Sequence, residues 1–101
     1  MPASETQDTP SFIDDFHTMS SFGATPGGGI DRQAATDDDA AVRRWFHSWL
    51  ENQGFRVEYD EIGNQYGLLE FVNDADFVLT GSHMDSQPLA GRFDGSYGVL
   101  A

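Results

Sequence analysis

The sequence has no cysteine and no lysine, and its 17 acidic side chains face only five arginines. Without cysteine there is neither a disulfide framework nor thiolate chemistry. The net charge of −12 disfavours phosphate backbones and anionic membrane surfaces as partners. No apolar run approaches the roughly 18 residues of a membrane span, and the first residues have no basic or apolar leader. We therefore expect a soluble, cytoplasmic protein with no nucleic-acid or membrane partner.

The length of 101 residues allows one small domain. Its acidity has two interpretations that the sequence leaves open. One is a surface adapted to strong salt, where screening relieves self-repulsion. The other is an ordinary acidic surface. A melting temperature that does not rise with added salt excludes the first.

The N-terminal third predicts one helix and one tight loop. Residues 1–10 are polar and contain two prolines, so we expect a loose leader. A helix is predicted from Ser11, with an apolar face, to an end at Gly23. Residues 25–30 include three consecutive glycines and predict a tight backbone path. This loop lacks the Gly-Lys-Ser/Thr ending of a phosphate-binding loop.

A second helix is predicted from an N-cap at Thr36 to a C-terminal cap at Gly54. Three consecutive aspartates follow Thr36, and their spacing is typical of a helix start rather than of a calcium loop. Apolar residues recur at helical spacing and predict a buried face; these are Val42, Trp45, Phe46, Trp49 and Leu50. His47 in this helix and His17 in the first are expected to be solvated surface residues.

Alternating and apolar runs predict three strands, at residues 55–59, 66–71 and 77–80. The last run, Phe77-Val78-Leu79-Thr80, is typical of a strand buried in a sheet. The order of helices and strands predicts an α/β fold in which a mixed sheet is flanked by helices. Residues 11–101 would form the N-terminal part of a catalytic domain, and the apolar end at residues 97–101 indicates that this domain is incomplete.

Most of the chemical signal follows the third predicted strand. His83 and Asp85 are two residues apart, a spacing that lets the carboxylate brace the imidazole of a metal ligand. Asp94 follows a loop bent by proline and glycine, and Gly95 lets the backbone pass close to a ligand. A hydrogen-bonded structural His–Asp pair remains the alternative. Ser82 and Ser86 lack a nucleophile-elbow motif, and Arg92 would either contact a substrate carboxylate or form a structural salt bridge.

Several segments together resemble the N-carbamoyl-amino-acid amidohydrolases, a family of dinuclear-zinc, peptidase-like hydrolases that includes β-ureidopropionase and allantoate amidohydrolase. The similar segments are Ser21-Phe22-Gly23-Ala24-Thr25, Gly28-Gly29-Ile30 with Arg32, Asp60-Glu61-Ile62-Gly63-Asn64, Gly81-Ser82-His83-Met84-Asp85-Ser86-Gln87-Pro88 and Gly91-Arg92-Phe93-Asp94-Gly95. They occur in the family's order and span most of the chain.

The resemblance implies a dizinc aminopeptidase-like fold and a metal-dependent amidohydrolase acting on the carbamoyl or ureido C–N bond of a small molecule. His83 would ligate one of two divalent ions, zinc or alternatively manganese or cobalt. Asp94 would bridge both ions, and Asp85 would be the catalytic residue that orients His83. In the family the general-base Glu and the remaining ligands lie beyond Asp94, so these 101 residues alone should be inactive.

The same resemblance implies a homodimer, formed through a domain that lies outside these residues. Two alternatives stay open. One is allantoate amidohydrolase or a related amidase. The other is a non-catalytic acidic binding module that keeps the loop without the metals.

Overall fold

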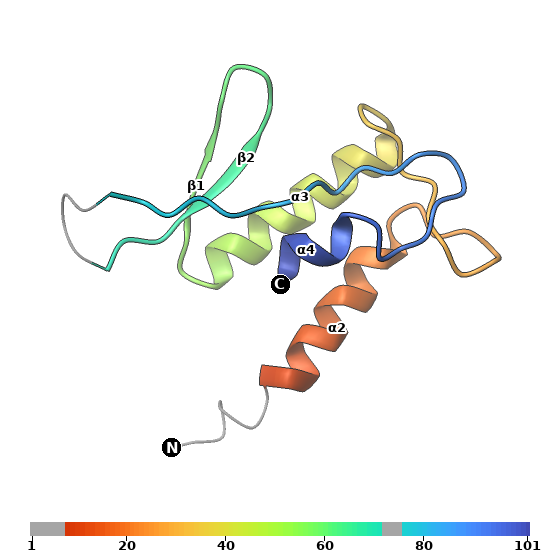
Figure 1. Ribbon diagram of the computed structural model, residues 1–101, viewed down its shortest axis with the longest axis horizontal. Coiled ribbons are helices and arrows are strands. Elements are labelled where there is room, and N and C mark those ends of the chain that lie inside the picture. The colour runs from red at the N-terminus through yellow and green to blue at the C-terminus, as the bar shows by residue number, and fades with distance from the viewer. Residues whose placement is uncertain (1–7, 72–75) are drawn as a thin grey trace. The chain divides into compact units, whose positions relative to one another are not determined.

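The computed structural model describes residues 8–71 and 76–101 (Figure 1). Its elements are helices α2 (Asp8–Ser21), α3 (Asp37–Asn52) and α4 (Ser96–Leu100), and strands β1 (Arg56–Tyr59) and β2 (Gln65–Leu68). This confirms the predicted α/β class, and the sheet consists of β1 and β2 within the described residues. No helix of the described part is long and apolar enough to cross a membrane.

The chain divides into two compact units. The first combines the described residues up to Val42 with Gly81–Ala101, and the second is Arg43–Thr80. All the candidate metal-site residues, His83, Asp85 and Asp94, belong to the first unit. The geometry of the site therefore follows from the packing of that unit alone.

Helix α2 begins at Asp8, three residues before the predicted start at Ser11. The prediction of a leader over residues 1–10 is thus wrong for its last three residues, and residues 1–7 lie outside the described part. Pro10 does not prevent the earlier start, because the first turn of a helix has no intrahelical partner for a backbone N–H. The helix buries Phe16 and Met19 in the core of the first unit.

The predicted end of this helix and the glycine loop after it are both confirmed. Gly23 follows the helix with φ +81°, a conformation that favours glycine. Beyond it the chain turns back on itself, and the Thr25 N–H donates to the Gly29 carbonyl at 3.0 Å. Ile30 then pairs with Ala90 through two 2.8 Å backbone hydrogen bonds. A Cβ at Gly29 would overlap the Ala90 carbonyl oxygen, so this glycine permits the close approach.

Both predicted caps of α3 are present. The Thr36 hydroxyl accepts a 3.3 Å hydrogen bond from the Asp39 N–H, which satisfies one free donor of the first turn. At the other end Gly54 has φ +90°, its N–H donates to the Glu51 carbonyl and the Phe55 N–H donates to the Leu50 carbonyl, each at 3.0 Å. This pair of bonds is the Schellman motif, so local sequence alone sets both ends of the helix.

The predicted apolar face of α3 is buried at three of its five positions. Val42, Phe46 and Leu50 are buried, whereas Trp45 and Trp49 are half-buried. Trp49 stacks on Phe46 with ring centroids 5.6 Å apart. The predicted buried face is thus confirmed at Val42, Phe46 and Leu50, while the two tryptophans are only partly buried.

Strands β1 and β2 form an antiparallel hairpin in which Arg56 faces Leu68 and Tyr59 faces Gln65. The turn between them is organised by the Asp60 carboxylate, which accepts hydrogen bonds from the backbone of Ile62 and Asn64, from the Asn64 amide and from the Tyr66 hydroxyl. These bonds lower the pKa of Asp60, and the bond from the Asn64 side chain contributes most. The hydrogen bond between Tyr66 and Asp60 raises the pKa of Tyr66.

The predicted buried strand at residues 77–80 is wrong for this structure. The segment does not form a strand. Phe77, Val78 and Leu79 are exposed, and Val78 has 94% of its surface accessible to solvent. The physical reason is the lack of a neighbour. β1 and β2 pair with each other, and no described residue forms a ladder with residues 77–80. The sequence pattern thus indicates a strand for which the described part offers no partner.

Candidate metal site

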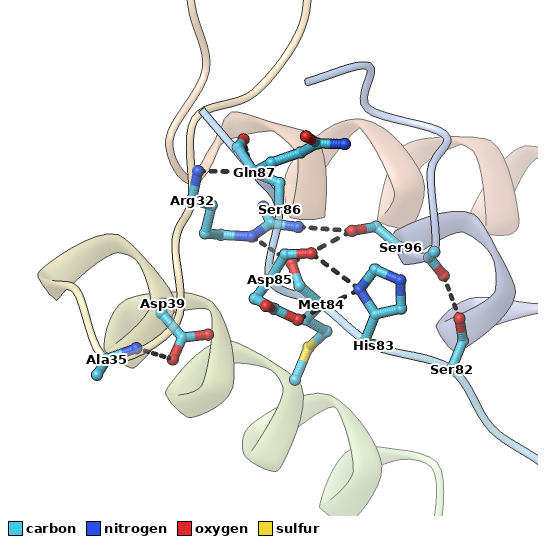
Figure 2. A network of polar contacts seen from close by, with 11 residues as sticks. Arg32, Ala35, Asp39, Ser82, His83, Met84, Asp85, Ser86, Gln87 and Ser96 are labelled. Atoms are coloured by element: carbon cyan, nitrogen blue, oxygen red, sulfur yellow. Dashed lines mark hydrogen bonds and ion pairs between the residues drawn. The ribbon is translucent and has the colours of Figure 1, made fainter. Parts of the chain in front are cut away.

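The His83 imidazole is held through one of its two ring nitrogens. Nδ1 lies 2.9 Å from the Asp85 main-chain oxygen and 3.2 Å from its carboxylate Oδ1 (Figure 2). Both neighbours are acceptors, so they favour the tautomer that carries its proton on Nδ1. The contact expected from the two-residue spacing is therefore present, and this tautomer leaves the lone pair of Nε2 free to bind a cation.

The Nε2 side of the ring lies against the backbone of Gly95. A Cβ at that position would overlap Nε2 and Cε1 of His83, and it would come within 2.7 Å of Cδ2. Gly95 also has φ +71°, which favours glycine independently. The Ser82 hydroxyl donates to the Gly95 carbonyl at 2.7 Å and fixes the approach of the two segments. Glycine at position 95 thus allows the segment that carries Asp94 to reach the His83 ring.

Asp94 lies immediately before this contact, in an exposed turn. Its N–H is 3.4 Å from the Gly91 carbonyl, and its own carbonyl accepts a 2.7 Å hydrogen bond from the Ser96 N–H. Its carboxylate lies on the Gly91 side of the turn, with Oδ2 3.9 Å from where a Cβ of Gly91 would be.

A nitrogen and a carboxylate donor on these adjacent segments fit the chemistry of zinc, manganese or cobalt. No group of three His, Asp or Glu side chains that could hold a metal occurs among residues 8–71 and 76–101. A catalytic zinc site needs three protein ligands. His83 and Asp94 are chemically suited to be two such ligands, and their role in binding a metal stays a prediction.

Arg92 does not form the structural salt bridge that was one of its two expected roles, and contact with a substrate stays a prediction. Its guanidinium lies 5.3 Å from the ring centroids of both Phe16 and Phe93, and Nη1 is 3.3 Å from Nδ1 of His17. In the part of the chain that the structure describes, no salt bridge or carboxylate hydrogen bond is formed by this side chain. Its charge is instead placed near two aromatic rings, an arrangement that allows cation–π attraction.

The predicted surface position is confirmed for His17, whereas His47 is half-buried, and each ring has a partner. His17 is exposed and contacts Arg92, as described above. His47 is half-buried, with Nδ1 2.7 Å from the Tyr59 hydroxyl and its ring stacked on that of Tyr59. These contacts assign structural positions to both histidines and add no ligand to the candidate site.

One residue that the sequence analysis does not assign to the site, Arg32, is hydrogen-bonded to the segments that carry it. Arg32 was noted only as part of a motif, yet it is fully buried and hydrogen-bonds residues on both sides of the site (Figure 2). Burial lowers its pKa, while the charges of Asp39, Asp38 and Asp85 act in the opposite direction. A lone arginine in a glycine-rich loop gives no sequence signal of burial, because arginine is ordinarily exposed.

Comparison of the sequence with those of known proteins shows which proteins the chain is similar to. No protein-family model matches it. It is 56% identical to a putative hydrolase of Mycolicibacterium smegmatis over 90 residues, which are 89% of this chain and 20% of that protein. It is 40% identical to the N-carbamoyl-L-amino-acid amidohydrolase of Rhizobium meliloti over 87% of this chain and 21% of the relative. An allantoate amidohydrolase of Escherichia coli is 36% identical over 82% of this chain and 20% of its own length.

Solved structures give the same result for the fold. A hydantoinase/carbamoylase family amidase from Burkholderia vietnamiensis superposes with a TM-score of 0.87 and 45% identity over 92% of this chain and 23% of that protein. One from Burkholderia ambifaria gives a TM-score of 0.86 and 42% identity over the same shares. In fold and in sequence the chain is thus similar to part of these amidases.

Its homologues are therefore named N-carbamoyl-L-amino-acid amidohydrolase and allantoate amidohydrolase, and its structural neighbours are hydantoinase/carbamoylase family amidases. It spans about a fifth of the length of the curated relatives it matches.

Proposed function

We propose that these residues form part of a longer, metal-dependent amidohydrolase that hydrolyses the carbamoyl or ureido C–N bond of an N-carbamoyl amino acid. The observation that carries the proposal is the His83 ring, whose Nδ1 is hydrogen-bonded by Asp85 while its Nε2 side packs on Gly95, next to Asp94. The names of related amidohydrolases support the reaction class. The substrate is a small molecule, and the protein acts in the cytoplasm as a homodimer formed through residues outside this chain.

Three side chains have separate tasks in this proposal. His83 and Asp94 would hold the divalent ions, His83 with an imidazole nitrogen and Asp94 with its carboxylate. Asp85 keeps the proton of His83 on Nδ1 and fixes the direction of the ring. Two divalent ions, zinc or alternatively manganese or cobalt, would lower the pKa of a shared water and polarise the substrate carbonyl.

Ser82 and Ser86 serve the backbone in this arrangement. The Ser82 hydroxyl donates to Gly95, and the Ser86 hydroxyl accepts from the Arg32 N–H while it donates to the Gln87 carbonyl. Both hydroxyls are thus used in holding the loop, which agrees with a reaction that has no serine nucleophile.

The test is hydrolysis of an N-carbamoyl amino acid by the complete protein and by its His83→Ala variant, with metal content measured in parallel. We expect loss of at least a hundredfold in kcat/KM and of one metal per chain for His83→Ala. His17→Ala is the matched control, because His17 is an exposed histidine of the same unit, and it should leave both values unchanged. A wild-type protein with well under one metal per chain supports the non-catalytic binding module instead.

A second candidate substrate is allantoate, which the relative from Escherichia coli is named for. The two functions share the site geometry described here and differ in substrate contacts elsewhere. Comparing kcat/KM for allantoate and for a panel of N-carbamoyl amino acids separates them. A tenfold or greater preference for allantoate would replace our first choice of substrate without altering the roles of His83, Asp85 and Asp94.

A further inference from the structure

Arg32 is a charged side chain with none of its surface exposed to solvent. Burying a charge is costly unless its hydrogen-bonding groups are satisfied. Its guanidinium meets this requirement with four oxygen acceptors at 2.8–2.9 Å, three of them main-chain carbonyls and one a hydroxyl. Four of its five N–H donors are thus bonded to neutral groups of the chain, which indicates that its role is to join segments of the chain.

The joined segments come from three places in the sequence. Nη1 donates to the Met19 and Phe22 carbonyls at the end of α2. Nε donates to the carbonyl of Met84, the residue between His83 and Asp85. Nη2 donates to the hydroxyl of Ser96, next to Gly95. The guanidinium therefore links both segments of the candidate metal site to α2.

Two further contacts strengthen this link. The Ser96 hydroxyl also lies 3.3 Å from the Met84 carbonyl, which closes a three-membered network with the guanidinium (Figure 2). The backbone of Arg32 exchanges hydrogen bonds with Ser86, since its N–H donates to the Ser86 hydroxyl and its carbonyl accepts from the Ser86 N–H. Met84, between His83 and Asp85, and Ser86, directly after Asp85, are thus both hydrogen-bonded to Arg32.

We propose that Arg32 is a positioning residue, which holds the His83–Asp85 segment in register with Asp94–Gly95 so that the His83 imidazole keeps one orientation and one tautomer. This inference rests on the proposed function for its consequence in catalysis, but its effect on His83 exists without a metal. Arginine is required because its planar fork reaches Met84, Ser96 and α2 in three directions at once. A lysine at this position would keep the charge but direct all its donors from a single nitrogen.

The test uses the complete protein with Arg32→Lys and Ser96→Ala, both checked for folding by circular dichroism. In the metal-free protein at about pH 8, where an ordinary imidazole is neutral, ring ¹⁵N shifts report the His83 tautomer. We expect a single Nδ1-protonated form in the wild type and averaged shifts in both variants. Arg44→Lys, which changes an exposed arginine of α3, is the matched control and should give the wild-type spectrum.

Zinc titration supplies the second measurement. We expect Arg32→Lys to weaken zinc binding about tenfold, the lower end of the effect of residues that orient metal ligands, and Ser96→Ala to weaken it in the same direction. If Arg32→Lys fails to fold, Ser96→Ala decides, because it keeps the buried arginine. Folded variants with wild-type His83 shifts overturn the proposal. A wild-type protein that binds no zinc contradicts the proposed function instead. In that case the ¹⁵N shifts of His83 alone test whether Arg32 positions the ring.

Discussion

Substituting Gly95 by alanine is the sharpest perturbation of the site, because the structure separates its two effects. The first is backbone strain, since φ is +71° and ψ is −52°, a conformation that L-residues rarely adopt and that costs them about 1–3 kcal/mol. The second is overlap of the new Cβ with the His83 ring. Gly28 provides a matched control, with φ +90° and no atom within 4 Å of an added Cβ.

We therefore expect Gly28→Ala to lose about 1–2 kcal/mol of unfolding free energy and to keep its metal affinity. Gly95→Ala should lose about 1–3 kcal/mol of unfolding free energy through backbone strain and, in addition, weaken zinc binding about 10–100-fold as His83 leaves its position. If the ring does not move, the overlap should instead add about 1–3 kcal/mol of destabilisation.

The assays are urea unfolding and zinc titration of the complete protein. Equal effects of the two substitutions on both stability and zinc affinity would refute the reasoning, because the contact between Gly95 and His83 would then have no energetic consequence.

Three further predictions concern the supporting structure. Thr36→Ala should lower the free energy of unfolding by about 1 kcal/mol through loss of the N-cap. Thr36→Ser keeps a capping hydroxyl and should retain most of the wild-type stability. The pKa of Asp60 is lowered by folding, so its contribution to stability is present above its unfolded value of about 3.9 and is lost as the pH falls through its folded pKa. The stability difference between wild type and Asp60→Asn in urea melts should therefore shrink on acidification, and a constant difference contradicts this. Val78→Asp should raise the solubility of the 101-residue chain, measured by centrifugation, because it breaks an exposed apolar run. Unchanged solubility would contradict the expectation that this run promotes aggregation.

Features encoded by neighbouring residues were predicted well from the sequence. Thr36 and Gly54 bound α3 as expected, because caps depend on backbone groups within one turn. The contact between His83 and Asp85 was likewise predictable, since their spacing limits where the two side chains meet.

Features that depend on distant segments were predicted poorly. The pattern of residues 77–80 is typical of a buried strand, but a strand needs a neighbour, and none of the described residues provides one. Arg32 contacts residues up to 64 positions away, so nothing in its local sequence shows that it is buried. The start of α2 is a different case, because the signal is local. The sequence analysis assigns Pro10 to a loop, although the first turn of a helix accepts proline, and α2 begins at Asp8.

The most direct test of the central claim is a crystal structure of the complete zinc-loaded protein, with anomalous scattering recorded at the zinc edge. We predict an anomalous peak about 2.0–2.1 Å from Nε2 of His83 and about 2.0–2.2 Å from a carboxylate oxygen of Asp94. The Nδ1 atom of His83 should remain hydrogen-bonded to Asp85. A peak bound to Nδ1, or zinc held elsewhere with His83 and Asp94 free of metal, would contradict the account.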